Sequence, residues 1–390
     1  MSFVDLFIFV LLKVRRLLGV IVCSFTCLVV YYRIGEGQFG SGDGYILYHD
    51  YCLHPNLFAP NHTENENRIT LVMHVDANYF NDRIVDQVRN WQAPVSLVLV
   101  LKEKYDYGCS YQKVKEILSA HPEVAALLRI HFMFSIEWSP KCAAPVDTPI
   151  QCIKRNYSEA DAVKYPINIA RNSARKVRRL DITYGIQFVM TKYSLMADYD
   201  HRFSAGFEVE VRRVAAERLT EKRVLVYRVF EIEQKAAEPT KISILKDIYA
   251  KGEAIVFHAR YYGVAHHIPG LKKWFQSNET KDIDIENIRY KNWEWEPFFV
   301  SRNDVPLYDV LFPYQFRNHA EISWELCRAG YQFDVLNKHF VYHRGIKTTQ
   351  KLSKEGLAKA ARVYSKALKA WKSRMNEEYP QTRGSCPEPH

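Results

Sequence analysis

Two carboxylates one residue apart, Asp198 and Asp200, directly follow a short apolar run at 195–197. In an extended strand end, residues i and i+2 point to the same side of the sheet. The pair is therefore predicted to converge on one hard divalent cation, Mn²⁺ or Mg²⁺, because such cations prefer oxygen ligands. Asp-x-Asp also occurs in solvated turns. The apolar strand before it favours the carboxyl end of a sheet strand, where open α/β sheets bind ligands.

The residues before this pair predict the sheet that positions it. Continuous apolar strands are expected at 68–74, 95–101 and 126–134, and helical stripes at 81–91 and 114–118 separate them. This βαβαβ alternation predicts an α/β fold with a doubly wound sheet. After the pair, the pattern predicts a helix capped by Ser204, a strand at 223–232, a helix at 242–249 closed by Gly252, an irregular aromatic region at 253–290 and a C-terminal helix at 357–371.

A helix beginning at Pro166 carries two stripes. The apolar stripe is expected to face the core. The polar stripe is either a solvated face or, for Arg171 and Asn172, a face turned toward the ligand crevice, because the strand that carries Asp198 follows. Residues 178–190 form an extra strand or a loop to which the sequence assigns no role. The full polar stripe is Asn168, Arg171, Asn172 and Arg175.

Composition sets broad limits on the protein class. The chain has 390 residues, 47% of them hydrophobic, which is enough to bury one large core or two smaller ones. Its net charge of +10 is spread along the sequence rather than gathered in runs. A nucleic-acid binder would show steeply salt-dependent binding, and the features of the N-terminus disfavour that class.

The first residues predict entry into the secretory pathway. An uncharged run at 17–32 follows three basic residues within 13–16, which predicts a signal-anchor helix with a cytosolic N-terminus; a cleaved signal sequence is the alternative. Sequons at Asn61, Asn156 and Asn278 agree with a lumenal location. Outside the run, an even number of cysteines can pair in an oxidising compartment, with no pairing assigned. They are Cys52, Cys109, Cys142, Cys152, Cys327 and Cys386.

Five segments follow one another along the chain: PINIARNSAR, LMADYDHRFS, WEPFFV, YDVLF and FDVLNKHFVYHRGIK. Together they resemble glycosyltransferase family 49, whose characterised members include glucuronyltransferases that extend dystroglycan-type glycans. The resemblance implies a GT-A fold (a Rossmann-like, doubly wound mixed sheet), single-pass type II topology, Golgi residence, a UDP-sugar donor, Mn²⁺ and inversion of the anomeric configuration. The implied organisation is a cytosolic tail at 1–16, an anchor at 17–32, a stem at 33–67, a catalytic domain at 68–372 and a tail at 373–390.

The resemblance also implies roles for particular residues. Asp198 and Asp200 would be the metal-binding pair and His343 the third metal ligand. The chemistry agrees, because a cation on the diphosphate lowers the cost of the charge that builds on the leaving group. Lys347 would neutralise a phosphate oxygen. His74, at the end of the first strand, would contact the nucleotide together with Arg171 and Asn172.

Inversion requires a base to take the proton from the acceptor hydroxyl, and a carboxylate on the acceptor side is the natural choice. Glu296 lies between Trp295 and Pro297, whose apolar side chains would raise its pKa. Asp309 lies in a segment that resembles the acceptor-side carboxylate segment of GT-A enzymes. Trp293 and Trp295 would stack on sugar rings or pack in the core. The candidate bases are Glu296 and Asp309, with Glu321 and Glu325 behind them.

The leading hypothesis is a metal-dependent lumenal transferase that moves glucuronic acid from its UDP-sugar to a glycan acceptor such as xylose. One departure from the family pattern is the connection at 178–190, which is about a dozen residues longer than in relatives. Because an insertion there could displace the strand that carries the site, a catalytically inactive lumenal glycan-binding protein on the same fold is the alternative. The oligomeric state is open, a homodimer included.

Overall fold

The computed structural model describes residues 40–42, 45–60, 65–144, 152, 164–176, 180–181, 186–187, 191–276, 282–348 and 353–390. The predicted anchor at 17–32 and the three sequons lie outside these residues. Among the helices within them, none is long and apolar enough to cross a membrane.

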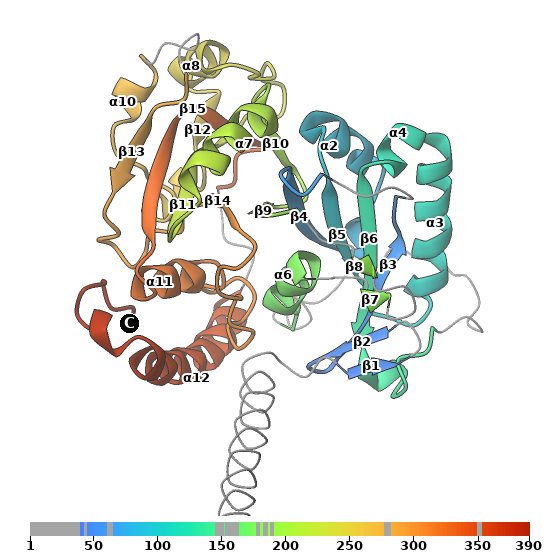
Figure 1. Ribbon diagram of the computed structural model, residues 1–390. Coiled ribbons are helices and arrows are strands. Elements are labelled where there is room, and N and C mark those ends of the chain that lie inside the picture. Colours follow the sequence, from blue (N-terminus) through green and yellow to red (C-terminus); the bar gives the residue numbers. More distant parts are fainter. Residues whose placement is uncertain are drawn as a thin grey trace, which may run out of the picture.

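A mixed sheet runs through the described chain and joins its two halves (Figure 1). Its path is β1-β2-β3-β6-β5-β4-β9-β14-β11-β15-β10, with β12 added to β11 and β13 added to β15. The strands are β1 Gly40–Gly42, β2 Tyr45–Tyr48, β3 Tyr51–Phe58, β4 Ile69–Asp76, β5 Val95–Val100, β6 Leu128–Ser135, β9 Tyr193–Met196, β10 His201–Phe203, β11 Arg223–Ile232, β12 Ala254–Val256, β13 Ile285–Ile288, β14 Phe299–Arg302 and β15 Gln332–Arg344.

The N-terminal half confirms the predicted βαβαβ unit. Strands β4, β5 and β6 pair in parallel, with α2 (Arg83–Trp91) and α3 (Asp106–Ala120) between them in sequence. All six side chains of β5 are buried, as expected of a parallel strand covered on both faces. β9 pairs in parallel with β4, so the Asp-x-Asp segment does follow the carboxyl end of a sheet strand.

The predicted stem at 33–67 contains part of the sheet, which differs from the sequence expectation. β2 and β3 pair antiparallel with each other, and β3 pairs with β6. The register of β3 shifts between His54 and Phe58, and Asn56 has a φ of 51°. This irregularity interrupts the alternation of apolar residues that would have revealed the strand. A disulfide between Cys52 and Cys142 also fixes β3.

The C-terminal half contains β11 and β15 as a long parallel pair, and β14 pairs antiparallel with β11. Figure 1 shows α11 (Ala320–Arg328) and α12 (Lys354–Glu378) packed together at one end of this half. The helix α8 (Ile242–Ala250) and strand β11 agree with their predicted ranges. α12 extends beyond its predicted end, and the Cys327–Cys386 disulfide connects the predicted C-terminal tail to α11.

The predicted cap of the helix after the Asp-x-Asp segment is wrong. α7 (Phe207–Arg218) begins after Gly206, which has the left-handed conformation and occupies the N-cap position. The Ser204 hydroxyl instead lies 3.0 Å from His339 Nδ1, on β15. Tertiary contact with β15 therefore replaces the local capping bond that the sequence suggests.

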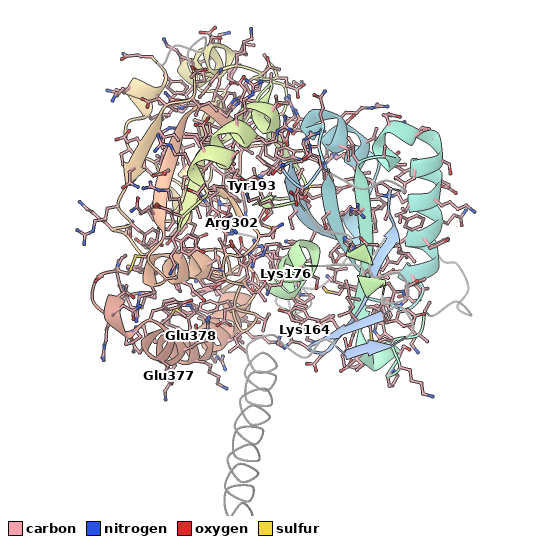
Figure 2. All side chains as sticks on the ribbon, viewed as in Figure 1. Lys164, Lys176, Tyr193, Arg302, Glu377 and Glu378 are labelled. Carbon is pink, nitrogen blue, oxygen red and sulfur yellow. A yellow bond between two sulfur atoms is a disulfide. The ribbon has the colours of Figure 1, made fainter. Side chains whose placement is uncertain are left out.

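The helix α6 (Ile167–Lys176) lies between the two halves (Figure 1). All four members of its polar stripe are buried, so the solvated-face alternative is wrong. They bond to the segment 305–318 of the other half, as described below. In Figure 2, Lys176 lies near Tyr193 and Arg302, which are paired across β9 and β14. The Lys176 Nζ donates to the Asn303 carbonyl at 3.2 Å.

The long connection at 178–190 contains a short hairpin. β7 (Leu180–Asp181) pairs antiparallel with β8 (Ile186–Gln187), in a sheet separate from the main one. The rest of the connection lies outside the described residues. The hairpin adds no strand to the path through β4, β9 and β14, so β9 keeps its place next to β4.

Candidate active site

The Asp-x-Asp pair lies in the turn between β9 and β10, not on an extended strand end as expected. The turn closes with a hydrogen bond from the His201 backbone N–H to the Asp198 carbonyl at 3.1 Å. Alternation along a strand therefore does not aim the two carboxylates at one point. About half of each side chain is exposed, 46% for Asp198 and 48% for Asp200.

Asp200 and His343 meet across the sheet although 143 residues separate them. His201 on β10 is paired in register with His343 on β15. This pairing brings His343 Nε2 to 2.9 Å from Asp200 Oδ2. Burial opposes the charged carboxylate, but the hydrogen bond and charge of His343 outweigh it and lower the pKa of Asp200 to about 2. Burial likewise favours the neutral imidazole, yet Asp200 raises the pKa of His343.

Asp198 faces a different imidazole. His201 is fully buried, its Nε2 lies 3.6 Å from Asp198 Oδ2, and that nitrogen has no hydrogen-bond partner within the described chain. Burial lowers the pKa of His201, which keeps this ring neutral. In this turn Asp198 therefore lies beside His201 of β10, and Asp200 lies beside His343 of β15.

The donor set fits a hard cation only in part. Asp200 Oδ2 and His343 Nε2 supply an oxygen and a nitrogen at one point, with the His343 Nδ1 held 2.9 Å from the Gly345 carbonyl oxygen. That second bond fixes the imidazole orientation, as metal-binding histidines require. Among the described residues, no group of three or more His, Cys, Asp or Glu side chains is gathered closely enough to hold a metal ion.

Side chains that the sequence predicts to contact the nucleotide instead form hydrogen bonds within the protein. His74 Nδ1 lies 2.9 Å from the Tyr165 hydroxyl. Burial, reinforced by the charge of Arg171, lowers the pKa of His74 to about 3, so the ring is neutral. The Asn172 amide donates to the Tyr308 carbonyl at 2.8 Å and accepts from the Tyr308 N–H at 2.9 Å. Asn172 therefore holds the protein backbone with the groups that a ligand would need.

The other members of the α6 polar stripe bond to the same segment of the C-terminal half. Arg171 Nη1 donates to the backbone and side-chain oxygens of Asn318 at 3.0 and 2.9 Å. Asn168 Nδ2 donates to the Asp309 carbonyl at 2.8 Å, and Arg175 Nη2 to the Val305 carbonyl at 3.2 Å. The stripe is thus a polar joint between the halves, a role that neither sequence interpretation included.

Lys347 lies just after β15, four residues after His343. Its Nζ donates to the Tyr261 hydroxyl at 3.1 Å, and its backbone N–H donates to Glu231 Oε2 at 3.2 Å. The charges of Glu231, Glu296 and Asp198 add to burial in raising the pKa of Tyr261. Tyr261 therefore lies within electrostatic range of both the Asp-x-Asp turn and the predicted base.

Glu296 has the environment of a general base. Its side chain is 15% exposed. Burial raises its pKa to about 7; Arg171 opposes this rise and Glu294 adds to it. A carboxylate with a pKa near neutrality is suited to accept a proton from a hydroxyl at physiological pH.

Asp309 has a different environment. Its Oδ2 lies 3.2 Å from Arg374 Nη2, and its Oδ1 accepts the Leu311 N–H at 3.0 Å. Arg374 also bonds to Glu325 at 2.8 Å. Glu321 is fully buried and accepts the Asp309 N–H at 3.1 Å. Three of the four predicted acids thus form a buried network, and Glu296 stands apart from it.

The two predicted tryptophans also differ. Trp295 is 6% exposed and packs in the C-terminal core, whereas Trp293 is partly exposed. The Arg317 guanidinium lies over the Trp293 ring at 4.6 Å and over the Tyr262 ring at 4.7 Å. Arg317 Nη1 is 3.9 Å from Glu296 Oε1. No sequence pattern marks Arg317, because a single arginine in a loop belongs to no stripe or motif.

Comparisons with known proteins find one matching family and several distant relatives. A family described as glycosyl-transferase for dystroglycan matches residues 68–380. Beta-1,4-glucuronyltransferase 1 from Mus musculus is 23% identical over 77% of this chain and 73% of that protein. The Bos taurus protein of the same name is 27% identical over 59% of this chain and 52% of its own length. Xylosyl- and glucuronyltransferase LARGE1 from Mus musculus is 20% identical over 72% of this chain and 32% of that protein.

Solved structures give weaker likenesses. GalNAc-T7 with UDP, GalNAc and Mn²⁺ covers 84% of this chain and 53% of its own at 12% identity and a TM-score of 0.36. S. aureus TarS 1-349 in complex with UDP covers 82% of this chain and 72% of its own at 10% identity and a TM-score of 0.36. The family match spans most of the chain and includes the Asp-x-Asp turn, Glu296 and His343. The chain therefore belongs to the family of glycosyl-transferases for dystroglycan.

Proposed function

We propose that this protein is a metal-dependent, inverting glycosyltransferase with a GT-A fold, which moves glucuronic acid from UDP-glucuronate to a glycan acceptor such as xylose. The 2.9 Å contact between Asp200 and His343 carries this proposal, because it joins two distant family segments at the carboxyl end of β9. Family membership supports the reaction class, and the names of the distant relatives support glucuronate as donor sugar.

Asp200, His343 and Asp198 would hold the cation. A bound Mn²⁺ or Mg²⁺ would supply charge neutralisation to the departing diphosphate. Ligation needs a neutral imidazole, whereas Asp200 favours the protonated form of His343. Cation binding would therefore release a proton, and affinity for the metal would fall as the pH falls. Lys347 would supply a second positive charge near the phosphates.

Glu296 would remove the proton from the acceptor hydroxyl as the hydroxyl oxygen attacks the anomeric carbon. Its raised pKa supports this assignment over Asp309, whose carboxylate is paired with Arg374. Arg317, stacked between Tyr262 and Trp293, would fix the position of the Glu296 carboxylate. The neutral His74 would lie on the nucleotide side.

Three disulfides and the N-terminal sequence support entry into the secretory pathway. The pairs Cys52–Cys142, Cys109–Cys152 and Cys327–Cys386 use every cysteine outside the apolar run. Disulfides persist in oxidising compartments such as the secretory lumen. Because the family resemblance implies Golgi residence, we propose a single-pass type II Golgi membrane protein with a lumenal catalytic domain.

A donor and acceptor screen tests the proposal. The purified full-length chain would be assayed for UDP release with UDP-glucuronate, UDP-xylose, UDP-galactose and UDP-N-acetylhexosamines, with and without methyl β-xyloside. We expect Mn²⁺-dependent release with UDP-glucuronate, stimulation by the xyloside, and loss of activity with EDTA that added Mn²⁺ restores. Absence of turnover with every donor, together with retained glycan binding, would support a glycan-binding protein instead.

A further inference from the structure

Residues 381–390 follow α12 and lie beyond the end of the family match. They return to the part of the C-terminal half that carries the candidate base. The His390 ring lies against the Trp293 indole, with ring centroids 4.5 Å apart. The His390 carbonyl accepts the Tyr364 hydroxyl at 3.2 Å, and Pro389 is buried. This segment is therefore packed against both α12 and Trp293.

A disulfide holds the same segment close to α11. Cys386 is bonded to Cys327 on α11, and His390 follows Cys386 by four positions. Because four residues span at most ~14 Å, the disulfide keeps the His390 backbone within that distance of its anchor. The same helix also holds Trp293, because Trp324 Nε1 donates to the Trp293 carbonyl at 2.6 Å. Thus α11 restrains both the tryptophan and the imidazole that packs on it.

Trp293 connects this contact to Glu296 through Arg317. The Arg317 guanidinium lies over the Trp293 ring at 4.6 Å, and Arg317 Nη1 lies 3.9 Å from Glu296 Oε1. The backbone of Arg317 has a φ of 56°, which costs free energy in a residue other than glycine and persists only where surrounding contacts hold it. The Trp293 ring is one of these contacts. Four side chains therefore form a continuous series from His390 to Glu296.

We propose that His390 is a positioning residue, whose ring keeps Trp293 and Arg317 stacked and thereby holds the Glu296 carboxylate at the acceptor hydroxyl. This inference rests on the proposed function, and it adds a segment outside the family match to the residues on which the reaction depends. Displacing a catalytic group by about 1 Å can lower a rate about 10²-fold. Removing only the His390 ring loosens the stack and leaves its other members in place, so the rate falls less.

Steady-state kinetics of two substitutions at His390 test the proposal. kcat and the donor KM would be measured with UDP-glucuronate and methyl β-xyloside, and circular dichroism would report the folded fraction at the assay temperature. We expect His390→Ala to lower kcat about tenfold with an unchanged donor KM. His390→Phe should restore most of kcat, because it keeps a ring against Trp293. Gln381→Ala, an exposed residue of the same segment, is the control and should match the wild type.

Hydrogen exchange provides a measurement that needs no turnover. Amide exchange of residues 292–297 would be compared between wild type, His390→Ala and the double variant Cys327→Ser/Cys386→Ser, which releases the anchor. Both variants should exchange faster there, because the hydrogen bond from the Glu296 N–H to the Ala265 carbonyl, 2.7 Å in the intact protein, opens more often. The His390 variants keep the disulfide, so they test the inference even if the double variant fails to fold.

The possible results separate this inference from the proposed function. Faster exchange in His390→Ala, in a protein that turns over no donor, would support the link between His390 and the Glu296 segment and count against the transferase alone. In an active enzyme, an unchanged kcat in His390→Ala would overturn the positioning role and leave the transferase proposal intact. A loss of kcat that His390→Phe does not restore would likewise overturn the role of the ring.

Discussion

The N-terminal and C-terminal halves share one sheet but divide its tasks. The N-terminal half has a regular core, in which β4, β5 and β6 are parallel, apolar and separated by helices, and the antiparallel β1, β2 and β3 extend it at one edge. The C-terminal half is mixed, with antiparallel additions and long loops, and it supplies His343, Glu296 and Lys347. The N-terminal half therefore provides the sheet edge at which the site forms, whereas the C-terminal half provides most of the reactive side chains.

We expect the largest effect on turnover from breaking the contact between Asp200 and His343. Asp200→Asn removes one negative charge from the Asp200–His343 pair and should lower turnover by about 10³-fold at saturating Mn²⁺, the upper range for removal of one electrostatic group from an active site. UDP release and circular dichroism would be measured together. Asp282→Asn, an exposed acid, is the control. Turnover within a few-fold of wild type would refute the metal role of Asp200.

We expect the next largest effect on turnover from Glu296, which lies in the C-terminal half. Glu296→Gln should lower kcat by about 10²-fold, as expected for loss of a general base, without changing the KM for the donor. Because the base must be ionised and its pKa is about 7, wild-type kcat/KM should fall as the pH drops below 7. Rates from pH 5 to 9 would be compared for both proteins. An acidic limb that persists in Glu296→Gln would assign the base elsewhere.

The polar joint between the halves should affect stability. Arg171→Met leaves the buried oxygens of Asn318 without their donor and should cost about 2–3 kcal/mol of unfolding free energy. Urea denaturation would measure this. The control is Arg89→Met, because the exposed Arg89–Glu123 ion pair should contribute less than about 1 kcal/mol. Equal stability losses in the two variants would show that the joint is no stronger than a surface pair.

The smallest effect should come from Asp309→Asn. The change weakens the ion pair with Arg374, so we expect a loss of about 1–2 kcal/mol, with kcat within a few-fold of wild type. Thermal unfolding and UDP release would be measured on the same sample. A large fall in kcat with unchanged stability would transfer the role of base from Glu296 to Asp309 and reverse the distinction drawn between them.

The parallel core of the N-terminal half could be predicted from sequence, and the remainder of both halves only in parts. β11 and α8 were predictable because each has a continuous local pattern. β2 and β3 were not, because a register shift and the positive φ of Asn56 interrupt the alternation in β3. The cap of α7 was missed because the Ser204 hydroxyl faces His339, a residue 135 positions away.

The amino-acid sequence was enough to predict the parallel unit, the Asp-x-Asp segment after an apolar strand, and the residue types that could bind a cation or accept a proton. Those features depend on local periodicity and chemistry. The folded structure was needed to show the His343–Asp200 contact, which only the family resemblance had implied. It was also needed to show that the α6 polar stripe holds the halves together and that Glu296 rather than Asp309 is left outside the buried network. Each of these depends on strand register or on burial between distant segments, and local sequence patterns specify neither.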